Sequence, residues 1–213
     1  MEQTSEALER APGSLVLGLR IGLISDTHIP EARKTLWPQV YEAFDGVDMI
    51  MHAGDIHELY LLDSLEEVAP VYAARGNGDD GGGGRPVQPE DARVRYAWTL
   101  QLEGMCIGLT HYIPVPERPP NFTLARWLER FFPERTPDVI VSGDTHREQI
   151  AEVAGVVCVN PGSPTYPHNY DTQYGTIGFL DLSDGEARPS VWQITEVGIQ
   201  PFDWDAVPPW KLR

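Results

Sequence analysis

The chain has 213 residues, 41% of them hydrophobic and 23% charged, which is the ordinary composition of a globular protein with one sizeable core. It carries 32 acidic and 16 basic residues, so its formal net charge is −16. A surface of this charge repels polyanions, and we therefore expect neither nucleic acid nor an anionic membrane as a partner.

The N-terminal segment, residues 1–14, is polar and acidic and lacks the basic start and apolar stretch of a signal peptide. We expect a flexible tail there and a cytoplasmic protein. Cys106 and Cys158 both lie in apolar, strand-like contexts, so we expect buried, inert thiols. Two cysteines fit no zinc–cysteine cluster.

The first part of the chain alternates between apolar runs and segments with helical spacing of apolar residues. Strands are predicted at residues 15–25, 47–53 and 71–76, and helices at residues 35–44 and 56–68. This order predicts a parallel sheet covered by helices.

The later part of the chain is richer in hairpins. Hairpins are predicted at residues 92–112, 148–160 and 174–195, with a helix at 121–132 and a strand at 137–143. Together the elements predict two packed sheets with helices outside, in one domain at residues 15–196. Residues 197–213 are predicted to be a tail that packs on this domain through Phe202, Trp204 and Trp210.

The segment "GNGDDG", residues 76–81, matches a dinucleotide-binding glycine pattern after a predicted strand. No helix follows it, however, and Asp79 and Asp80 would repel a pyrophosphate. We interpret this segment, residues 76–81, as a mobile surface loop.

Asp-x-His occurs three times directly after an apolar run, at residues 26–28, 55–57 and 144–146. In open α/β sheets, functional residues lie at the carboxyl ends of the parallel strands. Asn77 also lies at such an end, and His111 lies at the end of a hairpin strand. These oxygen and imidazole donors suit divalent first-row metals, and their number suggests two ions. Because residues i and i+2 of an extended segment point to the same side, each Asp-x-His is expected to aim both groups into one pocket.

The order of these motifs resembles that of calcineurin-like metallophosphoesterases. The motifs are "DTH" at 26–28, "GD" at 54–55, "GN" at 76–77, "TH" at 110–111, "GDTH" at 143–146 and "NPGS" at 160–163. Over roughly residues 15–195 the chain is similar to the small phosphodiesterase branch of that superfamily. The resemblance implies a four-layer α/β/β/α sandwich of two mixed sheets flanked by helices.

The resemblance also implies a dinuclear metal centre that hydrolyses small phosphodiesters with a metal-bridging hydroxide. It assigns Asp26, His28 and His146 to the first metal and Asp55 to both metals. It assigns Asn77, His111 and Asp144 to the second, with Asn77 and Asp55 as catalytic residues. Manganese is the expected ion, with nickel, iron, zinc or magnesium as substitutes.

Two positions depart from the family pattern. The family writes its late motif G-H-T-H, whereas this chain has Asp144 in place of the first histidine. Carboxylates bind such metals well, so we interpret this as a substituted ligand. Gly78 stands where many larger relatives have a histidine that is thought to help the leaving group. Leaving-group protonation then falls to water or to an unidentified group.

Several other residues are weaker candidates. Arg147 is a candidate contact for a phosphate oxygen, and His168 and Asn169 are candidates for the mouth of the pocket. His57 has no ligand role in the family and is a candidate substrate or proton-transfer group. His52 is expected to pack in the core or behind the ligands.

Two other functions remain open from sequence. One is a phosphomonoesterase; the other is an interaction scaffold, because a eukaryotic relative of this branch serves as a coat-complex subunit. Retention of a donor at every ligand position favours an enzyme. Residues 79–93 and 113–121 are expected to shape the pocket, and the family suggests a homodimer. The motifs do not identify the natural substrate.

Overall fold

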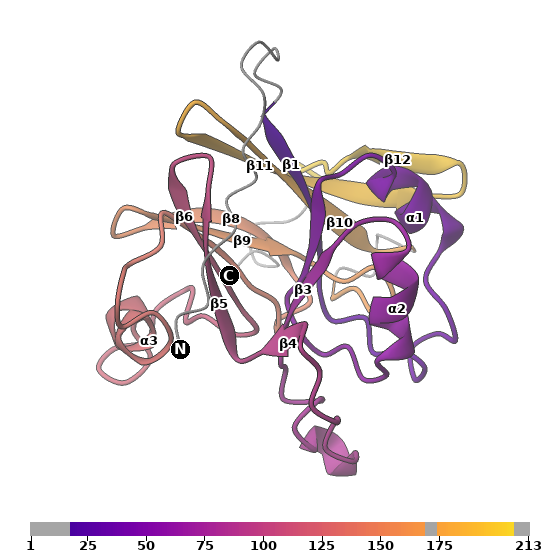
Figure 1. Ribbon diagram of the computed structural model, residues 1–213, viewed down its shortest axis with the longest axis horizontal. Coiled ribbons are helices and arrows are strands. Elements are labelled where there is room, and N and C mark those ends of the chain that lie inside the picture. The colour runs from indigo at the N-terminus through magenta and orange to yellow at the C-terminus, as the bar shows by residue number, and fades with distance from the viewer. Residues whose placement is uncertain (1–17, 169–173, 207–213) are drawn as a thin grey trace, which may run out of the picture.

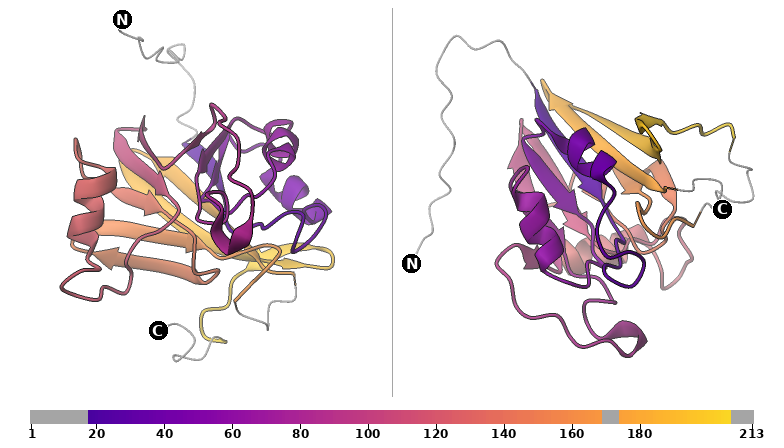
Figure 2. Two further views of the ribbon diagram at one scale, coloured as in Figure 1. Left: turned by 90° about the horizontal axis from the view of Figure 1, so that it is seen from below. Right: turned by 90° about the vertical axis from the view of Figure 1, so that its right-hand side faces the viewer.

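The computed structural model describes residues 18–168 and 174–206. Two β-sheets pack face to face, and helices cover their outer sides (Figure 1). In the left view of Figure 2, the salmon helix of the middle of the chain and the purple helices of the first part lie on opposite sides of the two sheets. The predicted four-layer architecture is confirmed.

The larger sheet has seven strands in the order β12-β11-β10-β1-β2-β3-β4. Its strands are β1 (Leu19–Ile24), β2 (Met49–His52), β3 (Val71–Ala74), β4 (Val94–Arg95), β10 (Thr176–Ser183), β11 (Glu186–Thr195) and β12 (Gly198–Pro201). Strands β1 to β3 run parallel, as the alternating pattern predicts, β4 continues the parallel order, and β10 to β12 add antiparallel pairs.

The smaller sheet has five strands in the order β5-β6-β7-β9-β8. They are β5 (Ala97–Leu102), β6 (Met105–Thr110), β7 (Val139–Val141), β8 (Glu148–Val153) and β9 (Val156–Pro161). Strands β6, β7 and β9 are parallel, while β5 and β8 pair antiparallel through the predicted hairpins. The carboxyl ends of β6 and β7 therefore share one edge.

The helices are α1 (Pro38–Phe44), α2 (Tyr60–Glu66) and α3 (Leu124–Phe131), and Gly82–Gly84 forms a 3₁₀ turn, η1. Pro38 opens α1, a position where its fixed φ and missing N–H cost nothing. Val40 and Phe44, four residues apart, form the buried face of α1. A Cβ at Gly22 would lie 2.9 Å from the Phe44 ring, so this glycine lets α1 approach β1 closely.

From Ile21 to Ile24, β1 is buried on both faces, and this explains the apolar sequence of that stretch. Ile24 packs under α1 and α2, while Leu23 packs between the two sheets. A third cluster lies between α3 and the smaller sheet and includes Cys158. Both cysteines are buried free thiols, as predicted.

Two strands differ from the sequence prediction. The hairpin predicted at residues 92–112 is formed by β5 and β6 but is shorter, because β4 pairs with β3 in the larger sheet. Strand β12 pairs with β11 in a segment that was predicted to be a tail. Phe202 and Trp204 pack against Val191, as expected for this segment, whereas residues 1–17 and Trp210 lie outside the described residues. Within the described ranges, no helix has the length and apolar character needed to cross a bilayer.

Candidate metal centre

Loops at the carboxyl ends of five strands converge on one site. Asp26 follows β1, Asp55 follows β2, Asn77 follows β3, His111 follows β6 and Asp144 follows β7. Parallel strands place these ends at the same edge, and the packing of the two sheets brings both edges together.

All seven sequence-predicted donors take part in this cluster. His146 Nε2 lies 3.7 Å from Asp26 Oδ1, and His111 Nε2 lies 3.6 Å from Asp144 Oδ1. Asn77 Oδ1 lies 3.2 Å from His111 Nε2. His28 Nε2 lies 3.4 Å from Asp55 Oδ2. The predicted residues thus come together, while their individual roles as ligands stay predictions.

The backbone of the three Asp-x-His motifs is left-handed, so the expected extended geometry is wrong. The φ angles are 53° and 45° at Asp26 and His28, 53° and 75° at Asp55 and His57, and 69° and 56° at Asp144 and His146. Such values are uncommon for residues other than glycine and cluster at functional sites. Each chain segment turns sharply after its strand, and Asp26 N and His28 N donate to Gly54 O and Asp55 O.

Asp26 is completely buried in the cluster. Its carboxylate accepts hydrogen bonds from Ser25 Oγ at 2.6 Å and from Asp144 N at 3.1 Å. Burial raises the pKa of Asp26 to about 6, against the opposing effect of His111 and His146. A cation beside this carboxylate would favour its ionised form.

Asp55 lies at the centre of the cluster and is 4% exposed. Its Oδ1 accepts a hydrogen bond from Gly78 N at 2.7 Å and lies 3.6 Å from His111 Nε2. Its Oδ2 instead faces His28. The two carboxylate oxygens therefore point toward different histidines.

Two histidines are held with Nε2 directed into the cluster. His111 Nδ1 lies 2.7 Å from Ala53 O, and His146 Nδ1 lies 2.6 Å from Tyr166 O. A carbonyl oxygen can only accept, so Nδ1–H donates and Nε2 is left for the cluster, as in metal-binding histidines. Burial lowers the pKa of His111, but Asp26, Asp55 and Asp144 outweigh it and raise that pKa above its ordinary value.

The cluster fits divalent metal ions. His28 Nε2 is buried and has no hydrogen-bond partner among the described residues. Burial lowers the pKa of His28 to about 4, so its ring is neutral near pH 7. Ligand atoms of Asp26, His28 and His146 lie within 4.8 Å of one another, and so do those of Asp26, Asp55 and His111. Carboxylate oxygen and neutral imidazole nitrogen suit first-row divalent metals.

Two glycines of the motifs are required by close approach. A Cβ at Gly54, where φ is 96°, would lie 2.5 Å from His111 Nδ1. A Cβ at Gly143 would lie 2.7 Å from Asp26 Oδ2. Each glycine thus lets a loop from one strand pass against a donor from another.

Residues of the "NPGS" segment and His52 form hydrogen bonds with the backbone of the loops that carry the donors. Asn160 Nδ2 donates to Gly143 O at 2.8 Å, and Ser163 Oγ donates to Asp26 O at 2.8 Å. His52 is fully buried and takes the supporting role expected for it, because its Nδ1 accepts from Gly54 N at 3.2 Å. Burial lowers the pKa of His52 to about 3, so its ring is neutral.

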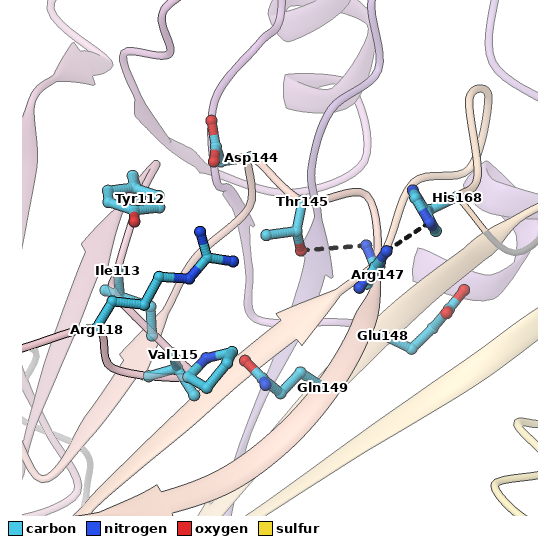
Figure 3. A pocket seen from close by; sticks show the side chains of 11 residues that line it. Tyr112, Ile113, Val115, Arg118, Asp144, Thr145, Arg147, Glu148, Gln149 and His168 are labelled. Atoms are coloured by element: carbon cyan, nitrogen blue, oxygen red, sulfur yellow. Dashed lines mark hydrogen bonds between the residues drawn. The ribbon is translucent and has the colours of Figure 1, made fainter. Parts of the chain in front are cut away.

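A pocket of about 390 Å³ opens beside Asp144 (Figure 3). Arg147 and His168 both line it, and Arg147 Nη2 lies 2.8 Å from His168 Nε2. Its other side is formed by Tyr112 and Arg118, and in Figure 3 the Arg118 guanidinium points toward Tyr112 and Asp144. The segment 113–121 was predicted to shape the pocket, but no motif singled out Arg118. Asn169 lies outside the described residues.

The glycine-rich segment also borders the cluster. Asp79 is buried and accepts hydrogen bonds from His57 N and Gly76 N, both at 2.8 Å. A second cavity, of about 560 Å³, is lined by Asn77, Asp80 and His111 among others. The first turn of the segment is therefore built around a carboxylate beside the candidate metal centre.

Comparison with known proteins agrees with this geometry. A probable metallophosphoesterase from Methanothermobacter thermautotrophicus is 37% identical over 151 residues, covering 71% of this chain and 80% of that protein. A phosphodiesterase from Methanocaldococcus jannaschii is 28% identical over 181 residues, covering 81% and 99%.

Solved structures show the same fold. Vacuolar protein sorting 29 from Cryptosporidium parvum superposes with a TM-score of 0.66 at 22% identity, covering 86% of this chain and 95% of that one. A novel archaeal phosphodiesterase gives a TM-score of 0.53 at 24% identity, covering 81% and 99%. The family model of the calcineurin-like phosphoesterase superfamily domain matches residues 19–185. That range holds every donor of the cluster, and the chain belongs to this superfamily of metallophosphoesterases.

Proposed function

We propose that this metallophosphoesterase is a dinuclear phosphodiesterase that acts on small phosphodiesters. The observation that carries the proposal is the position of Asp55. Its two carboxylate oxygens face His28 on one side and His111 on the other, at 3.4 and 3.6 Å. A carboxylate between two histidines that each bind a different ion can bridge the two ions, with one oxygen on each.

The remaining donors divide between two positions around Asp55. Asp26, His28 and His146 would hold the first ion, and their ligand atoms lie within 4.8 Å of one another. Asn77, His111 and Asp144 would hold the second. The high share of oxygen donors favours manganese, with nickel, iron, zinc and magnesium as alternatives.

The metals, when bound, would polarise the phosphoryl oxygens and make hydroxide available near neutral pH. The protein's own part is to position the substrate. Asn77 lies beside the bridging position, where its amide would stabilise charge on a phosphoryl oxygen. Arg147 and His168 line the neighbouring pocket and would contact the substrate's other oxygens.

Charge supports a diester rather than a monoester as the substrate. A monoester carries more negative charge, and the pocket lies against the Asp144 carboxylate in a protein of net charge −16. The pocket of about 390 Å³ has room for the second organic group of a small diester. A phosphomonoesterase and a catalytically weak scaffold are the alternatives.

Kinetics with matched aryl substrates would test the proposal. The purified protein would be stripped of metal, reconstituted with manganese, and assayed with bis(4-nitrophenyl) phosphate and with 4-nitrophenyl phosphate. We expect a higher kcat/KM for the diester and two bound ions by metal analysis. A preference for the monoester would establish the first alternative, and no turnover with any of the five metals would favour the scaffold.

Location and assembly are further parts of the proposal. A cytoplasmic location and a homodimer are expected from the sequence analysis. Cell fractionation would test the first, and light scattering after size-exclusion chromatography would test the second.

A further inference from the structure

The Asp-x-His motif at residues 55–57 ends in His57, a histidine for which the family pattern has no ligand role. The residue is 8% exposed, and its backbone is bridged to Ile29 of the first motif's loop. Its Nε2 atom is buried and has no hydrogen-bond partner among residues 18–168 and 174–206. A buried polar atom without a partner calls for an explanation.

The orientation of His57 resembles that of the histidines at the metal centre. Its Nδ1 lies 2.7 Å from Glu31 Oε2, and a carboxylate can only accept, so Nδ1–H donates. Nε2 then carries the lone pair, as it does in His111 and His146. A histidine whose Nδ1–H donates to a carboxylate is the usual arrangement of a metal ligand. Glu31 is held in turn by an ion pair with Arg85 of the glycine-rich segment.

His57 Nε2 lies near Asp55 of the candidate metal centre, because both flank the position that a Cβ at Gly78 would occupy. The His57 ring packs edge-on against His28, with centroids 4.4 Å apart. Ligand atoms of His28, Asp55 and His57 all lie within 4.8 Å of one another. This group shares two members with the predicted metal set and adds one new nitrogen.

Gly78 explains why the His57 ring can occupy this place. A Cβ at position 78 would lie 2.6 Å from His57 Nε2 and 3.0 Å from Asp55 Oδ1. Any larger side chain there would compete with the imidazole for the same space. Because position 78 has a glycine instead of a histidine, the space beside Asp55 is left for the His57 ring.

We propose that His57 Nε2 is an additional ligand of the metal ion held by His28 and Asp55. The proposal rests on the metal-binding part of the proposed function and does not depend on the substrate. A neutral nitrogen donor adds one coordination bond without adding charge. It also raises the site's preference for later first-row ions such as cobalt, nickel and zinc over magnesium.

Cobalt(II) binding would test the role of His57 without any assay of turnover. Affinity and stoichiometry would be measured by calorimetry, and the visible absorption of bound cobalt would report its coordination. The variants are His57→Phe, which keeps an aromatic ring but removes the donor, and Glu31→Ala, which removes the group that orients it. Glu58→Ala is the matched control, because Glu58 is an exposed neighbouring carboxylate.

In His57→Phe we expect the affinity for one cobalt ion to fall by about 100-fold and the absorption band to change, because losing a ligand should cost at least as much as losing its orienting partner. In Glu31→Ala we expect a fall of about tenfold for the same ion. Glu58→Ala should match the wild type in both measurements.

Unchanged affinity and absorption in His57→Phe would overturn the proposal, even if turnover were lost. Circular dichroism of the metal-free variants would establish folding. If His57→Phe does not fold, unchanged cobalt binding in Glu31→Ala overturns the proposal instead. If the cobalt results are as expected while no diester is hydrolysed, the phosphodiesterase proposal fails and the ligand proposal stands.

Discussion

The Oδ1 atom of Asp144 lies 3.6 Å from His111 Nε2, so the carboxylate that replaces the family's histidine faces another predicted ligand of the second metal. Asp144 N also donates to Asp26 Oδ1 at 3.1 Å, which ties this loop to the first metal position. The substitution therefore changes the charge of the centre while keeping a donor in place.

The first prediction concerns that charge. Two divalent ions carry four positive charges, and Asp26, Asp55 and Asp144 carry three negative ones. Asp144→His makes the centre more positive, so the nucleophilic water should lose its proton more readily. We expect the rising limb of the pH–rate profile to move to lower pH while activity is retained.

Asp144→Ala is the companion variant, and we expect it to weaken the second metal site more than the first. Unchanged metal content and turnover in Asp144→Ala would show that Asp144 is not a ligand. An unmoved pH profile in Asp144→His, with two metals bound, would leave the ligand role intact and refute the charge argument.

Asp55→Asn should remove the bridging carboxylate. We expect kcat to fall by at least about 100-fold, as for loss of a single stabilising donor, with lower metal content as well. Asp63→Asn is the control, because Asp63 is an exposed carboxylate on α2 that pairs with Arg93. Turnover near the wild-type value in Asp55→Asn would contradict the two-metal model.

The raised pKa of Asp26 makes the stability of the metal-free protein depend on pH. The pKa is about 6 in the folded chain against 3.8 for an ordinary aspartate, so between these values the folded state binds more protons than the unfolded state. The contribution of Asp26 to stability should then fall as pH rises through this range and level off above pH 6. The shift of about two units corresponds to roughly 3 kcal/mol for this fully buried group.

Chemical denaturation of the metal-free protein between pH 4 and about pH 7 would measure this effect. Burial also raises the pKa values of Asp79 and Glu148, which give slopes of the same sign, whereas the lowered pKa values of His28 and His52 give slopes of the opposite sign. The contribution of Asp26 is therefore the difference between the wild type and Asp26→Asn, and the stability of the wild type relative to this variant should decrease as pH rises. Equal slopes in the two proteins would remove Asp26 as the source.

Arg147 is predicted to hold the diester in its pocket. Arg147→Gln should raise KM for bis(4-nitrophenyl) phosphate by about tenfold, the loss expected when one charge-assisted hydrogen bond is removed. The change in kcat should be smaller, because the metal ligands are untouched. Arg126→Gln on the exposed side of α3 is the matched control. An unchanged KM in Arg147→Gln would exclude Arg147 from substrate binding.

Much of the fold and of the cluster could be predicted from sequence, because both depend on local patterns. Apolar runs such as 21–24 have the composition of strands buried on both faces, and the turns at Ala154 and Asp184 occur in left-handed conformations that close hairpins. The donors stand directly after such strands, so their position at one edge of each sheet follows from strand direction.

What the tertiary structure alone decided is where side chains point and which distant segments meet. Asp26 and His28 lie on left-handed backbone, which no spacing rule predicts for these residue types. Strand β4 joins the larger sheet by pairing with β3, which a long loop separates from it in the sequence. The His57 ring faces the metal centre because Glu31 orients it and Gly78 leaves room for it, and both come from other loops. Sequence patterns report backbone periodicity, whereas a side chain's direction is set by dihedral angles and by contacts that only the folded chain brings together.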